Sequence, residues 1–163
     1  MLFDSLKSIL NGLPDYNLSC KGELLQKAVL SDQQNAVEFA SFREDIYCRK
    51  IIHQVRDFDV VLIGWMPGQR SPIHNHPTNG CLVYPIQGEL FEERYCEELN
   101  PKSSNTVGVG QYSYIDNGIC VHKLGNASEE LPAISVHIYS PSNFVSTIFS
   151  KNGEKRKIMK AIP

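Results

Sequence analysis

The amino-acid sequence predicts a mainly β protein, an antiparallel sandwich or barrel with helices at its N-terminus. From about residue 46 to residue 150, short runs rich in β-branched and aromatic residues alternate with turn clusters such as MPGQRSP, HPTNG and IDNG. Strands at such near-regular spacing are typical of antiparallel sandwiches and barrels. Before about residue 45 the apolar residues instead recur at helical spacing. The change of pattern separates two structural parts.

The N-terminal part is expected to contain three helices. Apolar residues share one helical face over residues 2–10, and the following Asn-Gly pair is expected to end this first helix. A second helix begins near Gly22, in the run GELLQKAVL. Ser31 or Asp32 is positioned to cap a third helix, because short polar side chains accept hydrogen bonds from free backbone N–H groups.

The rest of the chain is expected to complete a single domain, because no internal repeat, low-complexity tract or linker interrupts it. The predicted domain covers residues 1–163, with a helical part at 1–45, a β-barrel at 46–150 and a basic, solvated tail at 151–163. The polar stretch NPKSSN is expected to be a turn. The strands are expected within residues 46–55, 60–66, 81–95, 110–115, 133–139 and 144–149.

The composition excludes several classes of protein. A hydrophobic share of 42%, a charged share of 21% and a net charge of −2 are ordinary for a globular protein. So small a charge gives no general attraction to nucleic acid or anionic lipid, and we expect neither as a partner. The start of the sequence lacks a secretory pattern, and no stretch approaches the ~20 apolar residues of a membrane span. We therefore expect a cytoplasmic protein, as a monomer or a weak homodimer.

The cysteines do not form a recognisable framework. Their odd number and wide spacing argue against a disulfide scaffold, and the absence of a CxxC pair argues against a structural zinc site. Four of them are expected to be reduced and partly buried, whereas Cys81 has a further significance described below. The five positions are Cys20, Cys48, Cys81, Cys96 and Cys120.

The most informative stretch is SPIHNHPTNGCLVYPIQGEL. His74 and His76 are separated by one residue, so on a strand both imidazoles point to the same face. Two such side chains can bind one metal ion. Imidazole ligands suit iron, zinc, copper and nickel, so the ligand type does not by itself select the metal.

The surroundings of this pair resemble the first cupin motif. Gly68 lies six positions before His74, and Gly88 lies seven positions after Cys81. The motif has a glycine, five residues, the sequence HxH, a short gap, a glutamate, six residues and a second glycine. Cys81 therefore occupies the position at which the motif usually supplies a glutamate ligand.

Downstream, GICVHKLGN resembles the second cupin motif. Its histidine, which supplies the third ligand, matches His122, and its asparagine matches Asn126. The spacing from Gly118 to His122 is one residue longer than usual. The two motifs together imply a cupin jelly-roll β-barrel that binds a metal through His74, His76 and His122.

With cysteine in place of the glutamate, residues from about 46 to 150 resemble the cysteine dioxygenase family. The resemblance implies a ferrous ion, Fe(2+), held by three neutral imidazoles. An anionic substrate, the thiolate of L-cysteine, would supply the missing negative charge. It also implies that both atoms of O2 are added to the sulfur, giving cysteine sulfinate.

The same resemblance assigns roles around Tyr139. In many family members the cysteine that matches Cys81 is joined to this tyrosine through a thioether. Ser135, His137 and Tyr139 match a hydrogen-bond relay that orients the tyrosine hydroxyl, and their alternation on one strand places them on one face. The step Ser140-Pro141 matches a serine–proline bond that is cis in the family.

Substrate binding is assigned to Tyr47 and Arg49, in the run IYCRK. Arginine offers a planar, permanently charged fork that suits a carboxylate. Relatives that prefer 3-mercaptopropionate carry glutamine at the position of Arg49, which favours cysteine here. A 3-mercaptopropionate or other small-thiol dioxygenase and a non-catalytic, ligand-binding cupin remain the alternatives.

Overall fold

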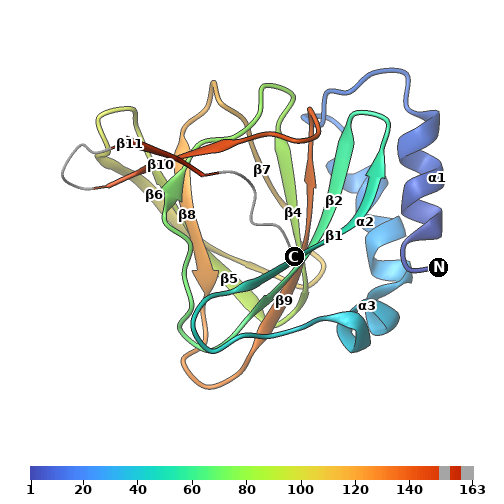
Figure 1. Cartoon of the computed structure of the whole chain (residues 1–163), viewed down its shortest axis with the longest axis horizontal. Helices are drawn as coiled ribbons and strands as arrows, with labels where there is room; N and C mark the ends of the chain where they lie inside the picture. The colour runs from blue at the N-terminus through green and yellow to red at the C-terminus, as the bar shows by residue number, and fades with distance from the viewer. Residues whose placement is uncertain (151–154, 159–163) are drawn as a thin grey trace.

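A computed structural model describes residues 1–150 in full and the backbone of residues 155–158. The described chain forms three N-terminal helices followed by two antiparallel β-sheets (Figure 1). The expectation of a mainly β protein with N-terminal helices is therefore confirmed. No helix among the described residues combines the length and hydropathy needed to cross a membrane.

The helices are α1 (Asp4–Gly12), α2 (Gly22–Ser31) and α3 (Gln33–Phe39). The expected capping of the third helix by a side chain is wrong in its detail. Asp32 does precede α3, but its carboxylate accepts hydrogen bonds from the backbone N–H of Phe3 and the side chain of Asn35. Asp32 therefore ties the start of α1 to the start of α3.

The strands belong to two sheets. The first sheet has the order β1-β2-β9-β4-β7, and the second has the order β11-β10-β3-β8-β5-β6. The bounds are β1 Cys48–Val55, β2 Phe58–Trp65, β3 Ile73–His74, β4 Cys81–Gln87, β5 Glu89–Tyr95, β6 Pro101–Gly108, β7 Ser113–Ile115, β8 Val121–Asn126, β9 Ala133–Tyr139, β10 Ser146–Phe149 and β11 Lys155–Ile158.

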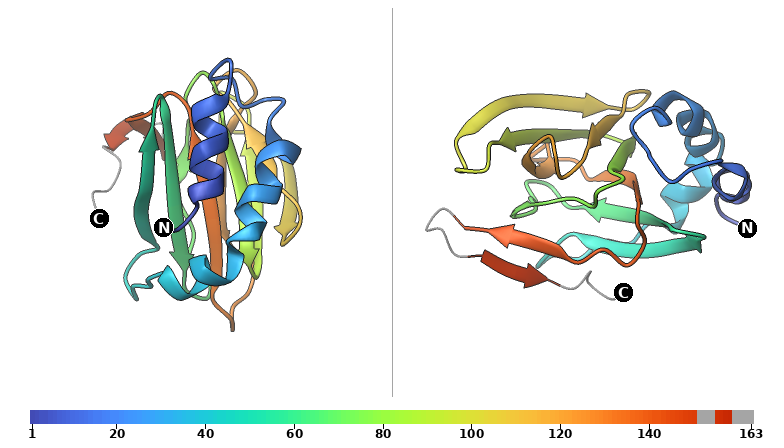
Figure 2. Two further views of the ribbon diagram at one scale, coloured as in Figure 1. Left: turned by 90° about the vertical axis from the view of Figure 1, so that its right-hand side faces the viewer. Right: turned by 90° about the horizontal axis from the view of Figure 1, so that it is seen from above.

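The helices cover one face of the first sheet, while the second sheet lies over its other face (Figure 2). Alternate residues of β2 show this division. Val60 and Leu62 pack in the cluster that includes the helices, whereas Ile63 and Trp65 pack in a second cluster between the sheets. Because both faces are buried, β2 is a nearly continuous apolar run.

Two expectations about the β part need correction. The stretch NPKSSN is not a turn, because β6 begins at Pro101 and pairs along its length with β5. This strand lies at the edge of the second sheet, and most of its side chains are exposed. It can therefore consist of polar residues that elsewhere are typical of a turn. Within the expected tail, residues 155–158 form β11 against β10, and residues 151–154 and 159–163 lie outside the described part.

Candidate metal centre

Three imidazoles converge between the sheets. His74 ends β3, His76 lies in the loop that follows, and His122 lies on β8 directly opposite His74 in the strand register. Their ring centroids are 4.8 Å (His74–His76), 4.8 Å (His74–His122) and 4.2 Å (His76–His122) apart. One ligand atom from each lies within 4.8 Å of those of the other two. The structure therefore brings together the three residues that the two motifs selected.

The nitrogens of these rings are arranged as metal ligands require. The Nδ1–H of His74 donates to the carbonyl of Pro72 at 2.9 Å, and the Nδ1–H of His122 donates to Glu92 at 2.7 Å. The Nε2 of His122 and both ring nitrogens of His76 are buried without a hydrogen-bond partner in residues 1–150. Since such atoms normally have a partner, the site fits a bound cation.

Burial also sets the charge state of the triad. It lowers the pKa of His74 to about 4. Burial first, and then the neighbouring imidazoles, hold the pKa values of His76 and His122 well below the usual 6.5. All three rings are therefore neutral near pH 7, which is the form that offers a nitrogen lone pair to a metal.

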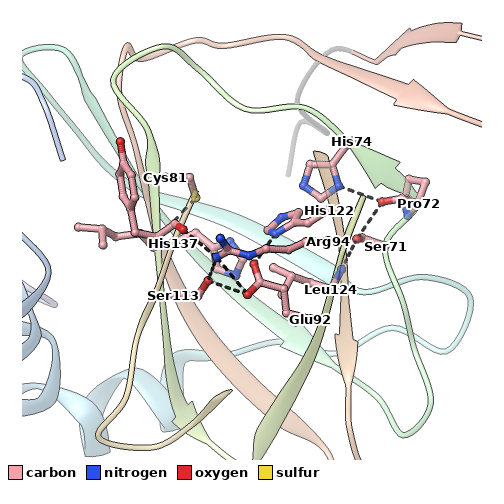
Figure 3. A network of polar contacts seen from close by, with 12 residues as sticks. Ser71, Pro72, His74, Cys81, Glu92, Arg94, Ser113, His122, Leu124 and His137 are labelled. Atoms are coloured by element: carbon pink, nitrogen blue, oxygen red, sulfur yellow. Dashed lines mark hydrogen bonds and ion pairs between the residues drawn. The ribbon is translucent and has the colours of Figure 1, made fainter. Parts of the chain in front are cut away.

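A buried carboxylate lies behind His122, and sequence reasoning missed it (Figure 3). One oxygen of Glu92 accepts from His122, and the other accepts from the Ser113 hydroxyl at 2.8 Å and from Arg94 at 3.3 Å. Arg94 also donates to the Ser113 hydroxyl and to the carbonyl of Tyr114. The network fixes both the tautomer and the orientation of the His122 ring.

A signal for Glu92 was present in the sequence. On β5 it lies two residues after the buried Leu90, so an alternating strand turns both side chains to the interior. A charged residue at an inward position is uncommon and needs a partner. The partner, however, lies thirty residues away on β8, and only the sheet order makes the two neighbours.

On the opposite wall, Cys81 and Tyr139 form a cross-strand pair. They are directly opposite in the register between β4 and β9, and both are buried. A hydrogen bond to Cys81 contributes to the raised pKa of the tyrosine, although burial is the larger cause. The geometry thus places the expected thioether partners side by side, and the Ser140-Pro141 bond is cis as expected.

The expected hydrogen-bond relay is also assembled. It has one member more than the sequence suggested, because it begins at Trp65 rather than at Ser135. The Ser135 hydroxyl lies 2.9 Å from Nε2 of His137, whose Nδ1 lies 3.2 Å from the Tyr139 hydroxyl. The indole N–H of Trp65 donates to Ser135 at 2.9 Å. With Trp65 as donor, the serine can donate to His137 and His137 to the tyrosine oxygen, so the relay does not use the phenol hydrogen.

Arg49 and Tyr47 reach the same place from β1 and the residue before it. The guanidinium carbon of Arg49 lies 5.7 Å from the centre of the Tyr139 ring, and Tyr47 stacks on Trp65 with ring centres 4.6 Å apart. Arg49 is half-buried and forms no ion pair within residues 1–150. With His74 it lines a cavity of about 20 Å³. Beside the metal centre thus lies a cation that has no ion-pair partner among the described side chains.

Comparison with known proteins agrees with this arrangement. The family profile described as cysteine dioxygenase type I matches residues 21–152. Cysteine dioxygenase type 1 from Homo sapiens is 28% identical over 144 residues, which cover 83% of this chain and 72% of the human protein. The protein of that name from Rattus norvegicus is 29% identical over 147 residues, which cover 83% and 74% of the two chains.

Solved structures share the fold. A Klebsiella pneumoniae protein with a double-stranded β-helix domain superimposes with a TM-score of 0.58 at 22% identity, over 69% of this chain and 87% of that one. Lactobacillus farciminis oxalate decarboxylase gives a TM-score of 0.54 at 15% identity, over 65% and 32%. At these identities the likeness concerns the fold alone, and it confirms the expected cupin barrel.

Proposed function

Since the chain belongs to the cysteine dioxygenase type I family, we propose that it is an iron-dependent dioxygenase that oxidises L-cysteine with O2 to cysteine sulfinate. The family and the three-histidine site support a thiol dioxygenase with a metal cofactor. The observation that carries the finer proposal is the position of Arg49, a cation that shares a cavity with His74 and Tyr139. A substrate that carries both a thiolate and a carboxylate satisfies both ends of this arrangement.

His74, His76 and His122 are the proposed ligands of the ferrous ion. Their neutral rings add no negative charge, and Cys81 stands where related motifs place a carboxylate ligand. The thiolate of the substrate would therefore be the anion nearest the metal. A ferrous ion, when bound, supplies the redox chemistry that joins the sulfur to both atoms of O2. The protein groups around it decide which thiol enters and how it lies.

Arg49 is the proposed partner of the substrate carboxylate. Its charge contributes to the low pKa values of His74 and His137, which places it within electrostatic reach of both rings. Tyr47 stacks on Trp65 beside it and can add a hydroxyl donor. The cavity between them holds about one water molecule, so the side chains that line it must shift when cysteine binds.

Tyr139 is the proposed hydrogen-bond donor to the reacting sulfur and oxygen atoms. His137 and Ser135 orient its hydroxyl, and Trp65 fixes the serine. Burial raises the pKa of the phenol, so it remains protonated and able to donate. We also propose a thioether between Cys81 and Tyr139, formed by loss of one hydrogen from each residue to O2.

The deciding experiment is anaerobic loading of the protein with ferrous ion, followed by O2 uptake with three matched thiols. L-Cysteine has the carboxylate and the amine, 3-mercaptopropionate lacks the amine, and cysteamine lacks the carboxylate. We expect the highest kcat/KM with cysteine, and cysteine sulfinate in amounts equal to the O2 consumed. Faster turnover of 3-mercaptopropionate would identify the other small-thiol dioxygenase, and absence of uptake with every thiol would favour a ligand-binding cupin.

The cellular setting follows from the same proposal. A free amino acid and O2 are the proposed partners. We therefore propose a cytoplasmic enzyme that acts as a monomer or a weak homodimer. Size-exclusion chromatography with light scattering over a range of concentrations checks the oligomeric state.

A further inference from the structure

Two cysteines outside the proposed site face each other at the ends of β5 and β8. The register of these antiparallel strands pairs Arg94 with His122 and Tyr95 with Val121. One further step along both strands places Cys96 opposite Cys120. The ladder ends at Tyr95 and Val121, and Cys96 and Cys120 are the next residues beyond it on the two segments.

The backbone hydrogen bonds show which kind of pair this is. The N–H of Ala127 donates to the carbonyl of Glu89 on the facing strand, so odd-numbered residues of β5 bond to β8. The N–H of Cys96 instead donates to Asn100, on the other side of the strand. Cys96 and Cys120 therefore stand at a non-hydrogen-bonded position one step beyond the last pair of the ladder. Within a ladder, the Cα atoms of such a pair are about 4.5 Å apart. A disulfide needs roughly 4.4–6.8 Å.

The two side chains also share a face and a cavity. Directly opposite residues of an antiparallel pair point to the same side, and this side includes the interior residues Leu90 and Leu124. Both cysteines line a cavity of about 490 Å³ together with Lys102 and Glu98. Cys96 is half-buried, Cys120 is buried, and both thiols are free. A small molecule can reach the cavity and the first thiol.

We propose that Cys96 and Cys120 are a redox-active dithiol that a small disulfide such as cystine oxidises to an intrachain disulfide. Cys96, the more exposed, attacks one sulfur of the small disulfide and releases the first small thiol. Cys120 then attacks the mixed disulfide at the sulfur of Cys96 and releases the second. The two protein thiols lose two protons and two electrons, and the small disulfide takes up both as two thiols.

The position gives this bond a consequence for the metal centre. Each cysteine lies two residues from Arg94 or His122 on the same face, so the disulfide would tie the strand ends next to a proposed ligand. The consequence rests on the proposed function, because the substrate thiol is then also the reductant that reopens the bond. The Cys96–Cys120 disulfide would therefore form when the free substrate thiol is scarce.

The test uses the full-length, metal-loaded protein under anaerobic conditions with an excess of cystine. We expect the count of free thiols in denaturant to fall by two, from five to three in chains without the Cys81–Tyr139 thioether and from four to two in chains that carry it. The intact mass should fall by two hydrogens without an adduct, and proteolysis should yield one peptide pair joined through Cys96 and Cys120. Dithiothreitol should restore both thiols. The measurement involves no turnover, so it is independent of the O2-uptake test of the proposed function.

Serine variants give the matched controls. Cys96→Ser and Cys120→Ser should each block the linkage, and Cys120→Ser should retain a cystine-derived adduct on Cys96. Cys20→Ser removes an exposed thiol of the N-terminal segment and should leave the linkage unchanged. Separate adducts on Cys96 and Cys120 of the wild-type protein, a link between other cysteines, or an unchanged thiol count would overturn the proposal.

Discussion

The two walls of the site are built for opposite charges. The metal wall, formed by β3, β5 and β8, carries His74 and His122 and has the buried carboxylate of Glu92 behind it. The substrate wall, formed by β1, β2 and β9, carries Arg49 and Tyr139. One wall presents lone pairs supported by a negative charge, and the other presents a positive charge and a hydroxyl. A cation and an anionic ligand can therefore occupy adjacent places between them.

The walls also differ in how their side chains are held. On the metal wall, Pro72 and Glu92 fix the two rings through their Nδ1 atoms. On the substrate wall, the relay is fixed up to Tyr139, but Arg49 forms no ion pair within residues 1–150. Two of the three ligand rings are therefore held in place before a metal binds, whereas Arg49 has no ion pair to break when it contacts a substrate.

The largest effect is expected from loss of a ligand on the metal wall. His74→Ala removes one of three converging nitrogens, so bound iron and O2 uptake should both fall by more than the roughly 100-fold associated with loss of an outer partner. Metal analysis and an oxygen electrode measure the two quantities. His53→Ala is the matched control, because this histidine bonds to the carbonyl of Leu2 outside the site. Retained iron-dependent activity in His74→Ala would refute the ligand assignment.

Acid should destabilise the metal-free protein through the buried histidines of the metal site. Burial holds the pKa of His76 well below 6.5, so this ring contributes stability above pH 6.5 that is lost as the pH falls. Below pH 6.5, each such histidine lowers the free energy of unfolding by up to about 1.4 kcal/mol for every pH unit. Urea unfolding of the metal-free protein between pH 7 and pH 5 should show a shallower pH dependence in His76→Phe than in the wild type. Equal slopes would contradict the neutral, buried state of the ring.

On the substrate wall, Arg49→Ala should leave iron in place and raise the KM for cysteine. A charged hydrogen bond contributes about 1.5–3 kcal/mol, which corresponds to roughly 10- to 150-fold. Cysteamine lacks the carboxylate and serves as the internal control, since its kcat/KM should change little. The KM of Arg49→Lys for cysteine should lie between those of the wild type and Arg49→Ala. An unchanged KM for cysteine in Arg49→Ala would exclude the carboxylate contact.

The outer partner on the metal wall should have a smaller effect than a ligand. Glu92→Leu removes the acceptor of the His122 N–H and should weaken metal binding by roughly 10- to 100-fold. Glu92→Gln keeps an acceptor oxygen and should recover most of that loss. Titration with Co(II), followed by its visible absorption, measures affinity without turnover. If Glu92→Leu bound cobalt as tightly as the wild type, Glu92 would have no positioning role.

On both walls, the sequence predicted residues that are close together in the chain better than contacts between strands, for a physical reason. Residues close together in the sequence have a spacing that can be recognised, as for His74 and His76 at the end of β3 or for the alternation along β9 that leads to Tyr139. Contacts between strands depend on sheet order, so neither the bond between Glu92 and His122 nor that between Trp65 and Ser135 could be found. The edge strand β6 was missed because its exposed faces need no apolar pattern.

The smallest effect should come from the far end of the relay on the substrate wall. Ser135→Ala leaves the indole N–H of Trp65 and the Nε2 of His137 without their common partner. The loss of buried hydrogen bonds should cost about 1–3 kcal/mol of stability. Because His137 still contacts Tyr139, we expect kcat to fall only a few-fold, with the KM for cysteine and the iron content unchanged. Ser113→Ala, which removes a β7 hydroxyl that donates to Glu92 of the metal wall, should instead alter metal affinity and leave the kcat of the fully loaded enzyme unchanged. The opposite pattern in the two serine variants would show that the walls are not separate in function.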